Sequence, residues 1–581
     1  MKKQKILMKN FLRFIGEYKK YVILSPVCVI GEVVMEILIP FIMAKIIDNG
    51  VIGGAGMSYI AYVGFIMIIM SIVSLIFGVA AGKFSAIAAV GFAKNIRKTL
   101  FDKIQDFSFA NIDKFSTASL IIRMTTDVVN IQNAFMMIIR MAVRAPFMLI
   151  GATIMAIFTS SKLAFVFLFA IPILAVALYI IMVIVHPRFK AMLEKYDKMN
   201  LNVQENLIGI RVVKAFVRED YENKKYKNTA DLVRKAQVFA EKLIVLNMPI
   251  MQFVVYSCIL SVLWFGGNMI IQGNMEIGQL TSFLVYIMQI LMSLMMISIV
   301  FIMMVISKAS RDRILEVLNE ESDIKNNGKN AKFKDNSIEF KNVCFSYNNK
   351  KDNLVLKNIN LSIKSGETLG IIGGTGSGKS TLVQLLPRLY DIFSGSLIIG
   401  GNSVKDYDLQ NLRDEIAMVL QKNVLFSGTI IENLLWGNEI ATNDEIIKVC
   451  KISQAHDFIT SFPNGYETKL GQGGVNLSGG QKQRICIARA LLKKPRILIL
   501  DDSTSAVDTA TEGKIRKALI NELPNTTKII IAQRILSIKD ADKIIVLNNG
   551  EINGYGTNEE LMGNNEIYRE IYYSQQNTAM E

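Results

Sequence analysis

The sequence predicts a bundle of membrane-spanning α-helices followed by a soluble α/β domain. The chain of 581 residues is 51% hydrophobic and only 20% charged, whereas soluble proteins are about a quarter charged. Long apolar runs lie between Tyr21 and Ile306, and the later residues have an ordinary globular composition. The net charge of +15 matches the excess of Lys and Arg that membrane proteins carry in cytoplasmic loops.

Six apolar runs are close to the roughly 20 residues that an α-helix needs to cross a bilayer. They are Tyr21–Ala44, Ser58–Ala81, Met137–Phe158, Leu163–Val185, Leu243–Ile271 and Leu280–Ile306. The first run is too long for a signal peptide, and no small-residue cleavage site follows it. Apolar residues among lysines in the first twenty positions predict an amphipathic helix on the inner membrane surface.

Basic residues indicate how the chain crosses the membrane. They gather in two stretches, at about 83–144 and 188–242, while the loops near 49–58 and 267–279 contain none. This asymmetry predicts a multi-pass protein of the cytoplasmic (inner) membrane with both termini in the cytoplasm. It also explains the net charge better than nucleic-acid binding does. Both stretches have helical periodicity, so we expect the helices to continue well beyond the bilayer.

Two carboxylates interrupt the first span. Glu32 and Glu36 are four residues apart and therefore share one face of a helix. Carboxylates at this depth usually face a water-filled cavity or a charged partner. They could bind a cationic substrate or form a structural ion pair, and the sequence leaves both interpretations open.

The polar stretch 321–336 predicts a linker between a transmembrane domain, residues 1–320, and a second domain, residues 337–581. In the second domain, short apolar strands such as Ser337–Phe340 and Leu369–Ile372 alternate with helices. This pattern is typical of an α/β domain with a mostly parallel sheet.

The motif G-x-x-x-x-G-K-[ST] follows the apolar strand Thr368–Ile372 and opens a helix at Thr381. It consists of Gly373, Gly374, Thr375, Gly376, Ser377, Gly378, Lys379 and Ser380. In such a strand–loop–helix setting, backbone N–H groups surround phosphate oxygens. Lys379 would reach the β- and γ-phosphates, and Ser380 would bind Mg²⁺. The second domain is therefore predicted to be a P-loop nucleotide-binding domain.

Two further features extend this prediction. The apolar strand Ile497–Leu500 is followed by Asp501, which suits a carboxylate that anchors Mg²⁺. The residues Leu477-Ser478-Gly479-Gly480-Gln481 open another helix, and a glycine-rich helix N-terminus is a second anion site. This second site does not obviously face the first within one chain, which suggests a site shared between two copies of the domain.

With these motifs in this order, the chain resembles ATP-binding cassette (ABC) exporters with fused membrane and nucleotide domains, over nearly all of its length. The resemblance implies a membrane α-helical bundle joined to an α/β P-loop ATPase domain that binds ATP and Mg²⁺. It implies that Tyr347 stacks on adenine, that Gln421 is the Q-loop residue near Mg²⁺, and that Ser505–Asp508 is the D-loop. The segments Ser108–Phe115 and Asn206–Phe216 resemble the family's coupling helices.

In that family two half-units form a dimer, and each ATP lies between one phosphate loop and the signature residues of the other subunit. Here the signature residues are Ser478, Gly479, Gly480 and Gln481. The resemblance therefore implies that these four residues contact the ATP bound to a partner subunit.

Two positions depart from the family pattern. Asp502 replaces the glutamate that acts as general base, and Gln533 replaces the switch histidine that touches the γ-phosphate. Both changes affect hydrolysis, whereas the residues that bind ATP are retained. The chain thus resembles the degenerate-site subunit of bacterial heterodimeric multidrug exporters.

The predicted function is ATP-driven export of small, amphipathic or drug-like compounds by alternating access. A second half-transporter, carrying the standard glutamate and histidine, would be the partner. The alternatives are a slow homodimer that exports a lipid or peptide, and an ATP-gated membrane regulator that transports nothing.

Overall fold

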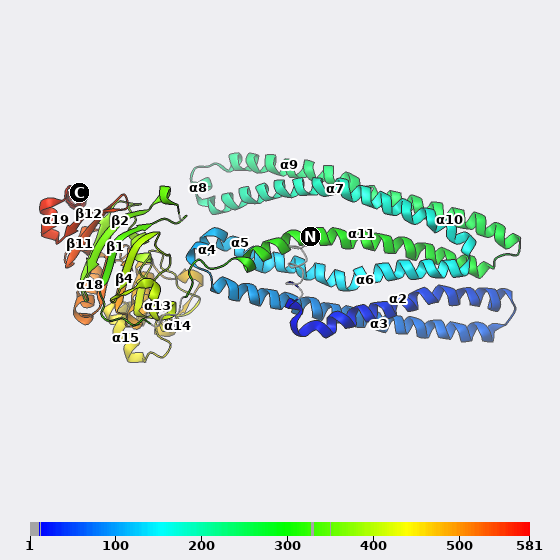
Figure 1. Ribbon diagram of the computed structural model, residues 1–581, viewed down its shortest axis with the longest axis horizontal. Coiled ribbons are helices and arrows are strands. Elements are labelled where there is room, and N and C mark those ends of the chain that lie inside the picture. Colours follow the sequence, from blue (N-terminus) through cyan, green and yellow to red (C-terminus); the bar gives the residue numbers. More distant parts are fainter. Residues whose placement is uncertain (1–10, 12, 327–330, 349, 581) are drawn as a thin grey trace. The chain divides into compact units, whose positions relative to one another are not determined.

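The computed structural model describes residues 11, 13–326, 331–348 and 350–580 (Figure 1). The chain divides into two compact units, Met1–Gln105 with Thr117–Glu320, and Asp106–Ser116 with Glu321–Glu581. The second unit thus includes a short segment from within the range 1–320. Most of the predicted N-terminal amphipathic helix, residues 1–10 and 12, lies outside the described residues, as do residues 327–330 of the predicted linker.

Six helices in the described part of the chain are long and apolar enough to cross a bilayer, as the sequence predicts. They are α2 (Lys19–Lys45), α3 (Met57–Gln105), α6 (Val128–Thr159), α7 (Ser161–Ile208), α10 (Asn247–Ile271) and α11 (Ile277–Asn319). The helices α3 and α7 contain 49 and 48 residues. At 1.5 Å per residue each is about 70 Å long, more than twice the thickness of a hydrocarbon core of about 30 Å. The predicted extension of helices beyond the bilayer is confirmed.

Shorter elements connect these helices. They are the 3₁₀ turn η1 (Arg13–Tyr18), the π-helical turns η2 (Ile46–Ile52) and η3 (Arg123–Asp127), and the helices α5 (Thr117–Ile122), α8 (Ile210–Ala215) and α9 (Glu219–Val245). In the first unit, α2, α3, α6 and α11 pack together, and α7 runs along α9 and α10 (Figure 1). Small buried residues at the helix contacts, such as Ala81, Ala152 and Ala156, allow the backbones to approach closely.

The described residues of the second unit form three sheets. Their strands are β1 (Ile338–Phe345), β2 (Leu356–Ile363), β3 (Thr368–Gly373), β4 (Ser394–Ile399), β5 (Asn402–Ser403), β6 (Ile416–Val419), β7 (Gly428–Thr429), β8 (Lys469–Leu470), β9 (Ile497–Asp501), β10 (Thr527–Ile531), β11 (Lys543–Asn548) and β12 (Glu551–Gly556). The largest sheet has the order β12-β11-β3-β10-β9-β6, and only its edge strand β12 is antiparallel to its neighbour. An antiparallel sheet, β2-β1-β4-β5, shares one apolar core with it. The strands β7 and β8 form a small pair of their own.

Helices surround these sheets. They are α12 (Lys379–Gln384), α13 (Leu409–Glu415), α14 (Ile430–Leu435), α15 (Asn443–Ile452), α16 (His456–Thr460), α17 (Gly479–Leu492), α18 (Thr509–Glu522), α19 (Asn558–Asn564) and α20 (Glu566–Met580). The strand β9 is buried at every position, as expected for a central parallel strand that is covered on both faces. The parallel sheet that the sequence predicts is therefore the centre of this unit.

The segment Asp106–Ser116 contains the helix α4 (Phe109–Phe115). Ser108 caps its N-terminus together with Asn111. The Tyr390 hydroxyl donates a 2.8 Å hydrogen bond to the Asp113 carboxylate, and the rings of Phe109 and Tyr390 are 6.1 Å apart. The first predicted coupling segment thus packs on Tyr390 within the second unit, whereas α8, in the other predicted segment, belongs to the first unit.

Candidate nucleotide-binding site

Four parallel strands end at one edge of the large sheet. The strand β3 leads into the phosphate loop, β9 ends at Asp501, and Gln533 and Gln421 each follow their strands, β10 and β6, by two residues. Because β3, β10, β9 and β6 are neighbours in this order, their carboxyl ends place the predicted catalytic and phosphate-binding residues side by side. Ligands of open α/β sheets bind at such an edge.

The backbone of the phosphate loop requires glycine at two positions in particular. A Cβ atom on Gly373 would lie 2.1 Å from the carbonyl oxygen of Leu547, and Gly378 has a left-handed φ of 97°. At Gly374 and Gly376 the same atom would meet open space. The loop is thus closed on the protein side and open on the other side, and Thr375 is exposed at its tip.

Side chains of the loop are available for a triphosphate. The Lys379 ammonium donates to the carbonyl oxygens of Gly373 and Gly374, each at 2.8 Å, and so lies over the loop. The buried Ser377 hydroxyl has no hydrogen-bond partner among the described residues. Burial lowers the pKa of the Lys379 ammonium. An anion at the loop would compensate for both features, so these residues fit the phosphates of ATP.

The two predicted Mg²⁺ ligands lie in contact. The Ser380 hydroxyl donates a 3.0 Å hydrogen bond to the Asp501 carboxylate. Burial raises the pKa of the Asp501 carboxyl, and the nearby charge of Asp502 adds to this effect. Mg²⁺ prefers one or two such oxygens together with substrate phosphates, so the pair fits the cation.

The two residues that depart from the family pattern bind each other. The Gln533 amide donates a 2.7 Å hydrogen bond to the Asp502 carboxylate, and the Gln421 side chain also hydrogen-bonds to it. Burial raises the pKa of the Asp502 carboxyl, while these two amides act in the opposite direction. In this arrangement both substituted side chains are already engaged with each other at the end of the sheet.

The predicted adenine platform lies beside the loop. The ring of Tyr347 is 46% exposed, and its hydroxyl is 2.9 Å from that of Thr381, the residue after Ser380. The Tyr390 ring packs edge-to-face against it at 5.1 Å and 88°. One face of the Tyr347 ring can therefore accept a base while its edge is held in place.

The signature residues form the start of α17. Ser478 and Gln481 cap each other, since the Gln481 N–H donates to the Ser478 hydroxyl and the Ser478 N–H donates to the Gln481 side chain. A Cβ atom on Gly480 would lie 2.7 Å from the carbonyl oxygen of Ala506 in the predicted D-loop. Within the described residues, no hydrogen bond or ion pair joins Ser478, Gly479, Gly480 or Gln481 to the phosphate loop.

Comparison with known proteins identifies the family. The family model of the ABC transporter transmembrane region matches residues 22–295, and that of the ABC transporter matches residues 356–505. An uncharacterized ABC transporter ATP-binding protein of Bacillus subtilis, YfiB, is 38% identical over 98% of both chains. The chain belongs to the ABC transporter family.

Other relatives cover most of the transporter. An ATP-dependent lipid A-core flippase of Desulfotalea psychrophila is 34% identical over 83% of this chain and 84% of its own. A solved structure of a bacterial Atm1-family ABC exporter with ATP bound has a TM-score of 0.84 and 23% identity, and covers 96% of this chain and 99% of that one. The transporter therefore has the ABC exporter fold, with an ABC ATPase domain fused to the membrane helices.

Replacing Tyr347 by Ala is expected to weaken ATP binding by about 5- to 150-fold, because base–aromatic stacking contributes about 1–3 kcal/mol per base. The change is measured as the dissociation constant of Mg²⁺-ATP for the full-length transporter in lipid nanodiscs. The control is Tyr347→Phe, which keeps the ring and loses only the contact with Thr381. An equal loss in both variants would contradict the stacking role.

The carboxylates of the first span are paired. Glu32 and Glu36 accept hydrogen bonds from the Arg144 guanidinium, at 2.5 and 2.7 Å. Both carboxylates thus share one guanidinium group. This geometry favours the structural ion pair, although the second carboxylate oxygen of Glu32 is buried without a hydrogen-bond partner in the described structure.

Sequence reasoning missed several residues that support these sites. Arg144 lies in the third predicted span, yet only the fold brings it to Glu32. Gln483, in α17, hydrogen-bonds to Ser505 and Ala506 of the D-loop. Tyr390 supports Tyr347 and also binds Asp113. None of the three had a local signal of function, because each acts through a partner that is distant in the sequence.

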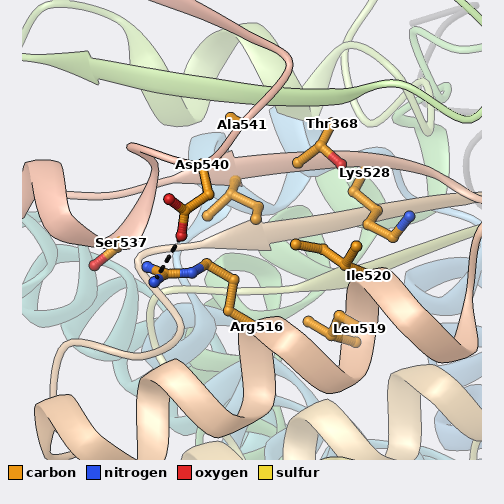
Figure 2. A pocket seen from close by; sticks show the side chains of 9 residues that line it. Thr368, Arg516, Leu519, Ile520, Lys528, Ser537, Asp540 and Ala541 are labelled. Atoms are coloured by element: carbon orange, nitrogen blue, oxygen red, sulfur yellow. Dashed lines mark ion pairs between the residues drawn. The ribbon is translucent and has the colours of Figure 1, made fainter. Parts of the chain in front are cut away.

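A separate small pocket lies between α18 and β10 (Figure 2). It has a volume of about 10 Å³, and the ion pair between Arg516 and Asp540, at 3.0 Å, lies beside it. This volume holds one water molecule at most, and none of the predicted nucleotide ligands lines it. The pocket is therefore not a ligand site.

Proposed function

We propose that this transporter is the degenerate-site half of a heterodimeric ABC exporter. Its own site binds Mg²⁺-ATP and hydrolyses it slowly, and a second half-transporter provides the main hydrolytic site. The dimer lies in the cytoplasmic membrane with both nucleotide-binding domains in the cytoplasm, and ATP drives export by alternating access.

The contact between Asp502 and Gln533 supports this proposal most directly. The Asp502 side chain is one methylene shorter than glutamate, and an error of about 1 Å in position can cost about 10²-fold in rate. Two amides also engage its carboxylate. Gln533 can donate a hydrogen bond but carries no positive charge and relays no proton. The short Asp502 side chain and the uncharged Gln533 amide both impair hydrolysis, and neither changes the phosphate loop that binds ATP.

The intact signature supports a role toward a partner. Ser478 and Gln481 form a complete cap at the start of α17, and Gly480 leaves room for the backbone of the D-loop. These residues are suited to complete the ATP site of the other subunit, where a standard glutamate and histidine would act.

For the substrate we propose small amphipathic or drug-like compounds. The cluster of Glu32, Glu36 and Arg144 contains the two carboxylates that the sequence also singled out. The second oxygen of Glu32, buried without a hydrogen-bond partner in the described structure, supports a contact with a cationic group of the substrate. The flippase relative, named for lipid A-core, supports amphipathic cargo in general.

The proposal is tested by purifying the chain alone in lipid and measuring Mg²⁺-ATP binding and hydrolysis together. We expect binding with turnover near background. Turnover on the order of 1–10 s⁻¹, ordinary for enzymes, would contradict the degenerate site. Slow turnover with movement of a lipid or peptide in vesicles would favour the homodimer, and ATP-dependent conformational change without any transport would favour the regulator.

A further inference from the structure

The C-terminal helix holds the backbone on both sides of Arg534, the residue after Gln533. Gln575, on α20, donates a 2.7 Å hydrogen bond from its amide nitrogen to the carbonyl oxygen of Gln533. Its amide oxygen accepts a 2.9 Å hydrogen bond from the N–H of Ile535. The amide of Gln575 thus forms two hydrogen bonds with the backbone, similar to those between neighbouring strands. These bonds fix the two peptide groups that flank Arg534.

The helix α20 is itself anchored next to this loop. Tyr568 is fully buried in an apolar cluster that also contains Ala532 and Ile535. From the other side, Arg516 of α18 donates to the carbonyl oxygen of Leu536 and pairs with Asp540 (Figure 2). The loop after β10 is therefore held from two helices, and Gln575 is the contact nearest to the nucleotide site.

The side chain of Gln533, whose carbonyl group Gln575 holds, lies next to the residues predicted to bind Mg²⁺. Gln533 binds Asp502, which directly follows Asp501, and Asp501 contacts Ser380. A Mg²⁺ ion held by Ser380 and Asp501 would neutralise charge on the terminal phosphates of ATP, as Mg²⁺ does in P-loop sites. This adjacency would place the Gln533 amide at the γ-phosphate end of a bound ATP, which ADP would leave empty.

We propose that Gln575 is a positioning residue that makes this site prefer ATP over ADP. By fixing the backbone at Gln533 and Ile535 before the nucleotide arrives, it removes the ordering cost that a γ-phosphate contact would otherwise carry. This role concerns the regulation of the proposed ATP-holding site, and it requires that the site bind ATP but not that hydrolysis be slow.

The test measures dissociation constants of two fluorescent probes, the methylanthraniloyl derivatives of ADP and of the non-hydrolysable imido analogue of ATP, both with Mg²⁺. The full-length transporter is used in lipid nanodiscs. We expect Gln575→Ala to raise the dissociation constant of the triphosphate probe by about 3- to 10-fold, the effect of losing one or two hydrogen bonds. The dissociation constant of the diphosphate probe should change by less than about 2-fold.

Gln575→Glu should weaken binding of the triphosphate probe at least as much as Gln575→Ala does. It keeps the acceptor for Ile535 but places a carboxylate oxygen against the carbonyl oxygen of Gln533. The matched control is Gln576→Ala, the next residue on the helix, whose side chain donates a hydrogen bond to the Tyr572 hydroxyl. In a Gln533→Ala background, Gln575→Ala should have no further effect on the ratio of the two affinities.

Three outcomes would overturn the proposal: an unchanged ratio in folded Gln575→Ala protein, an equal loss for both probes, or an equal effect in the Gln533→Ala background. The last two would indicate a purely structural contact. Because only binding is measured, rapid ATP turnover by the natural chain would refute the degenerate site without affecting this result.

Discussion

We expect the double variant Asp502→Glu/Gln533→His to hydrolyse ATP about 10²–10⁴ times faster than the natural chain, the range that a correctly placed general base contributes. Glutamate extends the carboxylate by one methylene toward the attacking water. Histidine replaces the amide that now binds this carboxylate at 2.7 Å. The signature of the same chain is intact, so two copies of the variant can complete each other's sites.

Each single substitution should raise the rate of ATP hydrolysis much less than the double substitution does. In Asp502→Glu alone, Gln533 still engages the carboxylate, and in Gln533→His alone the carboxylate remains too short. Such residues act as a unit, and their effects are far from additive. The measurement is steady-state phosphate release in lipid. The control adds Lys379→Ala, which should remove the gained activity. A double variant as slow as the natural chain would show that other features limit hydrolysis.

The second large effect is expected in the membrane unit. Replacing Arg144 by Leu leaves Glu32 and Glu36 without their guanidinium partner, and breaking a buried ion pair costs about 3–5 kcal/mol. We expect a clear fall in the thermal unfolding temperature in detergent. The control is Lys214→Ala, which removes the exposed pair with Glu219 and should cost less than about 1 kcal/mol.

Neutralising the carboxylates should reverse this loss. Arg144→Leu combined with Glu32→Gln and Glu36→Gln is expected to regain most of the stability, because no unpaired charge remains buried. In otherwise natural protein, Glu32→Gln should lower the export of monocationic compounds and spare neutral ones. Failure of the triple variant to recover would contradict the ion-pair explanation, and equal export of both classes would remove the substrate role.

The local patterns predicted much of the molecule, and their success has a physical reason. Apolar runs of bilayer length can only be buried as helices, and the phosphate loop needs its glycines wherever it occurs. Arg144 and Gln575 follow no such rule. Each is an ordinary polar residue in a helix, and its role depends on a partner that tertiary packing brings near. The contact between Asp502 and Gln533 needed the strand order β3-β10-β9, which periodicity does not specify.

The grouping of Asp106–Ser116 with the second unit bears on how the protein is made. Asp113 and Tyr390 are 277 positions apart, and chains generally fold in the order of their synthesis. The ribosome therefore releases α4 long before the surface that receives it exists. An unfinished copy that ends before Tyr390 presents α4, with the aromatic ring of Phe109 uncovered, and lacks the surface that receives it. Chaperones and proteases that recognise exposed aromatic surface can thereby distinguish incomplete copies from finished ones.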